Sequence, residues 1–342
     1  MNTILKRLLV LPGAVAVLLV MTDLCFAPPQ AGPIQPKFEA TCGADNTWTS
    51  TTNPNGGTAR NIAVGQNIDF DDKSTDYDPG ETQDGQGAAV DDPIDTHEWW
   101  VNDVSKGTNG TLDWSAPAEG EYLVKKKADD DPYVANDDPA FCYMKFQAYD
   151  VDYVTVTPDP GYVGVGATLK LTGHAWNDNG TPGNTADDIE VAATFDWSVN
   201  PALGTLSPAS GSSTTLTAGT TTGSCTVTAT HQPSEESGTA TVYVVKVVRG
   251  ANDLWWFDGE NAANYDEELT LTAQGTATGS FKWEVTAGAA KVDLNNGGAD
   301  ADTITATDDN TIQVKSTGAS AAANDVHIKL TIGAGLRFAR TT

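Results

Sequence analysis

The chain has 342 residues, long enough for two or three domains that each bury their own core. It carries 46 acidic against 19 basic residues, a formal net charge of −27, which opposes binding to nucleic acids and to anionic lipid surfaces. The four cysteines and four histidines are spread singly along the sequence, and this spacing excludes a zinc cluster and a disulfide-rich scaffold.

The first 27 residues have the pattern of an export signal. Lys6 and Arg7 precede the apolar run "LLVLPGAVAVLLVM", and small residues end this segment near Ala27. We predict a signal peptide over 1–27, cleaved after Ala27 or a few residues later; a retained membrane anchor and lipid attachment at Cys25 are the alternatives. No later segment is apolar over enough residues to cross a bilayer, so we expect a secreted or cell-surface chain with no membrane span after cleavage.

The rest of the chain predicts an all-β fold. Short runs with alternating apolar and polar residues recur between clusters of Gly, Pro, Asn and Asp, and this is typical of β-sandwiches. An internal repeat supports this, because "TLKLTGHAW" and "ELTLTAQG" are each followed by an aromatic strand, "FDWSV" or "FKWEV". A weaker copy, "NIDF" and "HEWWV", lies nearer the N-terminus. Period-two alternation predicts these inward side chains: Ile68, Phe70, Trp99, Val101, Leu169, Leu171, Phe195, Trp197, Val199, Leu269, Leu271, Phe281, Trp283 and Val285.

Each region closes with a further alternating strand. These strands are "FCYMKFQA", "SCTVTAT" and "DVHIKLTI", and the first two are followed by "DYVTVTP" and "TATVYVVKVV", which we expect to connect neighbouring domains. The predicted domains are therefore 36–151, 152–246 and 247–342. The last one ends soon after its closing strand, so it is either shortened or finishes with "GLRFA".

The sequence resembles known families at this level. "VTVTPDPGYVGVGATLKLTGHA" and "FDWSVNPALGTLSP" are similar to the tandem bacterial Ig-like (Big-type) domains of surface proteins, while "VGQNIDFDDKSTDYD" and "GEYLVKKKADD" resemble PKD-type repeats. The resemblance implies three tandem immunoglobulin-like β-sandwich domains, the first of them PKD-like. It also implies a spacer, an adhesin or an accessory binding protein, with an extracellular protein or a glycan as partner.

Two acidic segments lie at the same point of the repeat, between the leucine strand and the tryptophan strand. Carboxylate and carbonyl oxygens are the ligands that calcium prefers, so calcium is the one cofactor the sequence suggests. In a sandwich the loop of the middle domain should lie beside the linker "AYDVDY", where a cation could stiffen the joint; the alternative is a set of solvated loop acids. The candidate ligands are Asp150, Asp152, Asp178, Asp187 and Asp188 at the joint, and Asp71, Asp72, Asp76 and Asp78 in the first loop.

Adjacent tryptophans raise a second possibility. In "HEWWV" and "DLWWFDG" one member of each pair must point outward if both lie in a strand, and we take Trp100 and Trp256 as these members. An outward tryptophan can stack on a sugar ring or become buried at a domain interface. No nucleophile elbow, zinc-binding helix or phosphate-binding loop is present, so we expect no enzymatic activity.

The cysteines allow one bridge. Cys42 and Cys142 would close a loop of about a hundred residues, which stabilises a fold by several kcal/mol in the chain-entropy model. Cys225 has no partner in its own region and is expected to be a buried thiol that acts as a small apolar residue. The function predicted from the sequence is an exported, non-catalytic structural or adhesion protein; the alternatives are a carbohydrate-binding accessory protein and a calcium-rigidified spacer.

Overall fold

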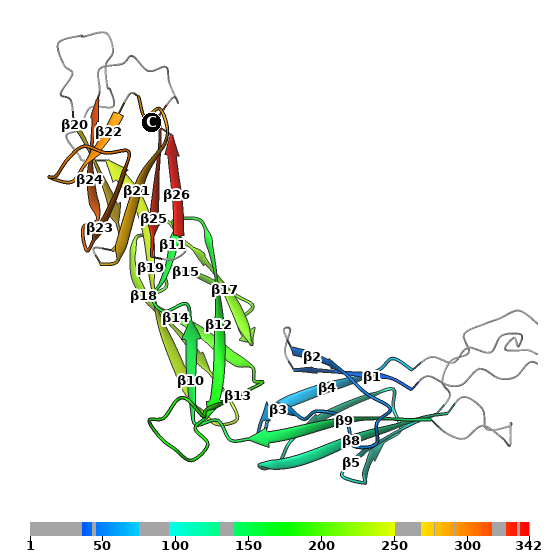
Figure 1. Ribbon diagram of the computed structural model, residues 1–342. Helices are drawn as coiled ribbons and strands as arrows, with labels where there is room; N and C mark the ends of the chain where they lie inside the picture. Colours follow the sequence, from blue (N-terminus) through cyan, green and yellow to red (C-terminus); the bar gives the residue numbers. More distant parts are fainter. Residues whose placement is uncertain are drawn as a thin grey trace, which may run out of the picture.

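The computed structural model describes residues 36–42, 46–74, 96–129, 140–249, 268–276, 278–290, 292–316, 326–333 and 336–341. These residues form strands and turns without an α-helix, so no helix among them is long and apolar enough to cross a bilayer. The predicted signal peptide, 1–27, lies outside them. Their buried side chains gather into three separate clusters, each between two sheets, and Figure 1 shows the three resulting sandwiches following one another along the chain.

The first sandwich pairs a sheet with strand order β2-β1-β4-β7 with a sheet of order β3-β9-β8-β5-β6. Strict alternation produces the core: β4 buries Ile68 and Phe70 and exposes Asn67, Asp69 and Asp71. Phe70 contacts Trp99, Trp114 and Phe146 at centroid distances of 5.8 to 6.5 Å. The strands are β1 Phe38–Cys42, β2 Asn46–Thr49, β3 Arg60–Ala63, β4 Asn67–Asp72, β5 Thr96–Val101, β6 Val104–Gly107, β7 Thr111–Ser115, β8 Gly120–Asp129 and β9 Ala140–Tyr149.

The second sandwich has one sheet of order β10-β12-β17-β15, with β13 beside β12. The other sheet has the order β16-β14-β18-β19, with β11 parallel to β19. This is the arrangement of an immunoglobulin-like domain in which β12 is strand B, β14 strand C, β18 strand F and β19 strand G. The strands are β10 Tyr153–Thr157, β11 Gly161–Gly164, β12 Thr168–Asn177, β13 Ile189–Val191, β14 Phe195–Asn200, β15 Gly204–Ser207, β16 Ser210–Gly211, β17 Ser213–Ala218, β18 Gly223–Thr230 and β19 Ser237–Arg249.

The third sandwich starts on the same strand that ends the second. The last part of β19 pairs with β20 and continues the sheet to β24 and β22, while the facing sheet has the order β23-β21-β25-β26. β26 pairs along its length with β25, so a closing strand follows "DVHIKLTI". The strands are β20 Glu268–Gln274, β21 Ser280–Ala287, β22 Val292–Asn295, β23 Thr303–Thr307, β24 Thr311–Ser316, β25 His327–Ile332 and β26 Leu336–Thr341.

The predicted fold class is confirmed: the described chain is all-β and built of immunoglobulin-like sandwiches. Trp99, Trp197 and Trp283 are all buried, with exposed fractions of 1%, 7% and 1%. One strand assignment was wrong. "FCYMKFQA" (β9) is the last strand of the first sandwich, since it pairs with β8 and β3, and "DYVTVTP" (β10) pairs with β12 of the second sandwich. β19, in contrast, does connect two sandwiches and crosses the predicted boundary at 246.

Candidate functional site: the first joint and an aromatic–lysine face

The joint between the first and second sandwiches is made by backbone contacts. The Ala63 N–H donates to the carbonyl of Ala192 at 3.0 Å, and the Ala192 N–H donates to the carbonyl of Asn61 at 3.0 Å. Beside them, the buried Gln66 side-chain oxygen accepts hydrogen bonds from the Thr194 N–H at 2.7 Å and its hydroxyl at 3.1 Å. Strand β3 of one sandwich is thus paired with the segment after β13 of the other.

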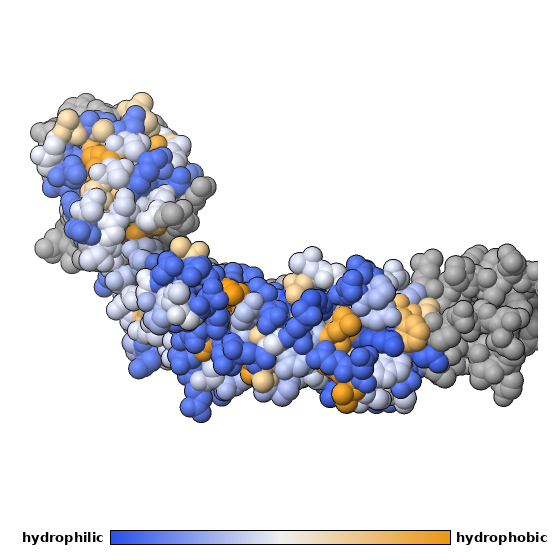
Figure 2. Space-filling model, turned by 60° about the horizontal axis from the view of Figure 1, so that its bottom comes forward, coloured by the Kyte–Doolittle hydropathy of each residue, from blue (hydrophilic) through white to orange (hydrophobic). Residues whose placement is uncertain are grey.

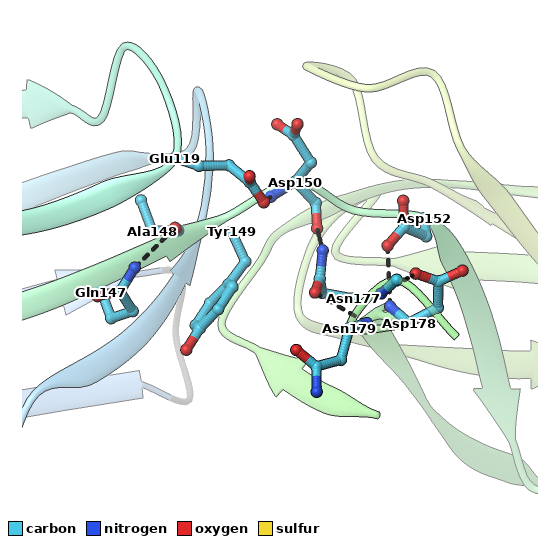
Figure 3. Close-up of a pocket in the computed structure, with 10 residues that line it drawn as sticks. Glu119, Gln147, Ala148, Tyr149, Asp150, Asp152, Asn177, Asp178 and Asn179 are labelled. Atoms are coloured by element: carbon cyan, nitrogen blue, oxygen red, sulfur yellow. Dashed lines mark hydrogen bonds between the residues drawn. The ribbon is translucent and has the colours of Figure 1, made fainter. Parts of the chain in front are cut away.

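On one side of this joint lies a polar hollow of about 410 Å³. Figure 3 shows how the linker and the β12–β13 loop form it together. Glu119 Oε1 accepts from the Asp150 N–H at 3.0 Å, and the Asp152 Oδ2 accepts from the Asp178 N–H at 2.8 Å. The Asn177 side-chain amide donates to the Asp150 carbonyl at 3.1 Å. The first of these bonds ties the turn before β8 to the linker, and the other two tie the β12–β13 loop of the second sandwich to it.

The structure brings together three of the five carboxylates predicted at the joint. Asp150, Asp152 and Asp178 line the hollow. Asp187 instead accepts hydrogen bonds within its own loop, from the Thr181 hydroxyl at 3.0 Å and the Asn184 amide at 2.7 Å.

Asp188 also has another partner, because its Oδ2 accepts a hydrogen bond from the Tyr153 hydroxyl. The pKa of Tyr153 is raised to about 12, mainly by this hydrogen bond and to a lesser extent by partial burial. The part of the chain that the structure describes contains no group of three His, Cys, Asp or Glu side chains placed to hold a metal ion. A calcium ion at this joint stays a prediction.

The carboxylates predicted in the first loop are also paired. Asp71 forms an ion pair with Lys73, and Asp72 forms one with Lys126. Asp76 and Asp78 lie outside the described residues, as does Trp256.

The structure does not form the predicted Cys42–Cys142 bridge, and both thiols are buried and free. The Cys142 thiol contacts the Ser50 side chain, and the Ser50 hydroxyl accepts a hydrogen bond from the Phe38 N–H. Cys142 is therefore near Phe38 at the start of β1, whereas Cys42 is at the end of that strand. Four residues of strand span about 13 Å, and a disulfide needs Cα atoms within about 7 Å. Burial raises the pKa of Cys42 to about 12 and that of Cys142 to about 11. Cys225 is a buried free thiol, as expected.

Trp100 points away from the core, as the alternation predicts. It lies in register with Lys125 of β8, which is in turn opposite Tyr143 of β9. The Lys125 Nζ lies 4.7 Å from the centroid of the Trp100 ring and 4.3 Å from that of Phe141, and the two rings are 6.3 Å apart. We call Trp100, Lys125, Phe141 and Tyr143 the aromatic–lysine face; all four are half-buried.

The aromatic–lysine face combines a cation with two aromatic rings at a partly exposed position of a strongly acidic protein. The view in Figure 2 shows hydrophilic residues over most of the surface, with hydrophobic residues as small separate patches. An ammonium group between two aromatic rings provides both a positive charge and flat apolar area, a combination that suits sugar rings and acidic groups. The sequence pattern located Trp100 but gave no sign of Lys125 and Phe141 as its neighbours, because that contact depends on the register of three strands.

No protein-family model matches the sequence. No curated protein matches it either. Among the solved structures that share a low-level likeness with this chain are the following three. Surface layer protein SbsC, domains 4–9, is 13% identical over 85% of this chain, with a TM-score of 0.24. The chain spans about half, 46%, of the length of that structure. The Escherichia coli adhesin FdeC is 15% identical, with 89% of this chain and 94% of that chain covered and a TM-score of 0.27. Invasin, described as a bacterial integrin-binding protein, is 13% identical over 83% of this chain and 58% of its own, with a TM-score of 0.22.

At these identities and scores, the class of the protein rests on its own strands. They define a tandem immunoglobulin-like β-sandwich protein, with strands B, C, F and G in place in the second sandwich and a strand shared between the second and the third. The resemblance of the first sandwich to PKD-type repeats stays a prediction.

Proposed function

We propose that the protein is an exported, non-catalytic structural or adhesion protein of the cell surface or extracellular space. The observation that supports this most is the way the sandwiches are joined end to end. A single 13-residue strand, β19, serves two of them, and β3 pairs with the second sandwich at the other joint. Serial domains with strand-to-strand joints hold a binding surface at a distance, and such an arrangement needs no catalytic site.

Export and surface exposure can be tested with the full chain expressed in a bacterium with an epitope tag at the C-terminus. The expected result is that the tag is found in the medium or is removed from intact cells by added protease. The matched control lacks residues 2–27 and is expected to stay inside the cells. A full chain that remains in the cytoplasm with its N-terminus intact would contradict the proposal.

A carbohydrate-binding accessory protein is the second candidate, and the aromatic–lysine face favours it. The test is a glycan array probed with the full chain and with Trp100→Ala. Trp176→Ala is the matched control, because Trp176 is also partly exposed but stacks on Tyr153 in the second sandwich. Sugar binding by this face requires a signal that Trp100→Ala removes and Trp176→Ala retains; an array without any signal would rule this function out.

A calcium-rigidified spacer is the third candidate, supported by the three carboxylates that line the first joint. Calcium that binds only the folded chain must raise the melting temperature. The test compares melting in millimolar calcium and in chelator for the wild type and Asp152→Asn. Equal melting temperatures of the wild type in both conditions would reject the site.

A further inference from the structure

The core of the first sandwich contains a buried lysine. Val124, Lys126 and Ala128 share the inward side of β8, and each has an exposed fraction of 0%. The Lys126 Nζ lies 2.5 Å from Asp72 Oδ1 and donates a hydrogen bond of 2.9 Å to the Ser74 hydroxyl. Asp72 itself has a side-chain exposure of only 11%.

This pair connects the two sheets at a specific place in the fold. Asp72 ends β4, which corresponds to strand B, and Lys126 is on β8, which precedes the last strand of the sandwich and corresponds to strand F. Trp99, on the strand that corresponds to C, lies beside it, with its ring centroid 5.7 Å from the lysine Nζ. In antibody domains the B–F disulfide that joins the sheets packs against a tryptophan on strand C. Lys126 and Asp72 occupy the equivalent place in a sandwich whose two cysteines are too far apart to bridge.

Burial makes the ionised form of this pair costly. Charges taken out of water must be closely paired, or they exchange a proton and become neutral. Transfer of one proton from the Lys126 ammonium to the Asp72 carboxylate gives an amine and a carboxylic acid held in contact. A neutral amine is a nucleophile, and a fixed contact of this kind replaces the entropy cost of a bimolecular encounter.

We propose that Lys126 and Asp72 form an intramolecular amide bond that joins the two sheets covalently. The Lys126 Nζ attacks the Asp72 carboxyl carbon and forms the C–N bond, and the electron pair of the C=O bond moves to the oxygen. The nitrogen loses a proton, the carbonyl re-forms, the C–OH bond breaks, and the hydroxyl takes up that proton and leaves as water. No oxidant, reductant or second substrate is needed.

Two neighbours are placed to assist this reaction. The Ser74 N–H donates a hydrogen bond of 2.8 Å to Asp72 Oδ1, and His97 Nδ1 lies 2.8 Å from Asp72 Oδ2, although without the alignment of a hydrogen bond. The Ser74 N–H is placed to stabilise the negative charge that develops on Oδ1 when the amine attacks. The His97 imidazole, beside Oδ2, can carry the proton to the hydroxyl that leaves from that position.

The test is mass spectrometry of the purified, fully denatured full chain. The proposal requires that the chain lacks the mass of one water molecule. It also requires that trypsin releases a branched peptide in which residues 61–73 are attached to Lys126. An intact mass with no loss, together with a linear 61–73 peptide, would overturn the proposal.

Controls separate the amide from other losses of water, such as ring closure at Asp84, which precedes a glycine. Lys126→Arg keeps the charge but supplies no nucleophilic amine, so it must show the full mass and no branched peptide. Asp72→Asn provides an independent check, because it releases ammonia instead of water and so gives the same branched peptide as the wild type. A branched peptide from Lys126→Arg would refute the assignment. Its absence from the wild type and from Asp72→Asn would refute it as well.

Discussion

The buried Gln66 side chain adds two hydrogen bonds across the first joint, so Gln66→Ala should loosen it. The Gln66 oxygen accepts both the N–H and the hydroxyl of Thr194, and Gln66 is only 6% exposed. A typical internal hydrogen bond contributes about 1 kcal/mol net, so the two bonds together contribute about 2 kcal/mol to docking of the sandwiches. Since 1.4 kcal/mol is a factor of ten, the open form of the joint should become roughly 30-fold more populated.

Amide hydrogen exchange read peptide by peptide measures this opening directly. The Ala192 N–H is bonded across the joint, so a peptide that contains residues 190–195 should exchange roughly 30-fold faster in Gln66→Ala than in the wild type. Peptides from β18, in the core of the second sandwich, should keep their protection. The matched control is Gln313→Ala, which lies on β24 of the third sandwich and should leave exchange at the joint unchanged.

Two outcomes would refute this reasoning. Unchanged exchange at 190–195 would mean that the backbone bonds of the joint hold without Gln66. Equally faster exchange in β18 would mean that the substitution unfolds the second sandwich and does not act at the joint.

Three further predictions follow from burial and backbone geometry. Burial lowers the pKa of His231 from 6.5 to about 4, so below pH 6.5 the unfolded chain binds a proton that the folded chain excludes. Stability to urea should therefore fall by up to about 3 kcal/mol as the pH drops from 6.5 to 4, and His231→Phe should remove this dependence. Gly65→Ala should lower the free energy of unfolding more than Gly166→Ala. Both glycines have a positive φ, 77° and 72°, so the backbone strain of an alanine is similar at the two positions. Only at Gly65 does the new Cβ come within 2.8 Å of a proline across the joint. Trp99→Ala should cost about 3–5 kcal/mol of unfolding free energy and Trp100→Ala about 1 kcal/mol, because only the first ring is in the core; equal losses would contradict the assigned faces.

The sequence predicted the parts of the fold that depend on period-two alternation. Trp197 and Trp283 are buried because their strands alternate cleanly, and the internal repeat identified their strand neighbours. The order of strands in the first sandwich was harder to predict. The strand Gly120–Asp129 contains three consecutive lysines and so resembles an exposed segment, yet Lys126 is fully buried beside Asp72. Alternation from Val124 was the signal that could have placed Lys126 in the core.

The candidate site shows a different limit of sequence analysis. The expected topology of a sandwich put the β12–β13 loop beside the linker, where Asp178 lies, but the composition of the loop could not show which oxygens were already engaged. Asp187 bonds to Thr181 and Asn184 within a few residues of itself, because short polar side chains in a loop find local partners before distant ones. Whether carboxylates converge depends on these local bonds, which composition does not record.

The two joints of the chain are built differently, and this difference bears on how force or motion passes along it. At the second joint, β19 continues from one core to the next, and the stacked rings of Tyr162 and Tyr243, 5.4 Å apart, pack against the third core. At the first joint, the docking combines backbone bonds around Ala192, the Gln66 contact, the linker bonds at the hollow and the packing of Ala63 and Val151 against the second core, but no strand continues from one core to the next. Bending should therefore concentrate at the first joint. If an amide ties the sheets of the first sandwich, it stiffens that sandwich beside the joint where bending concentrates, so the sandwich can change orientation while the aromatic–lysine face keeps its shape.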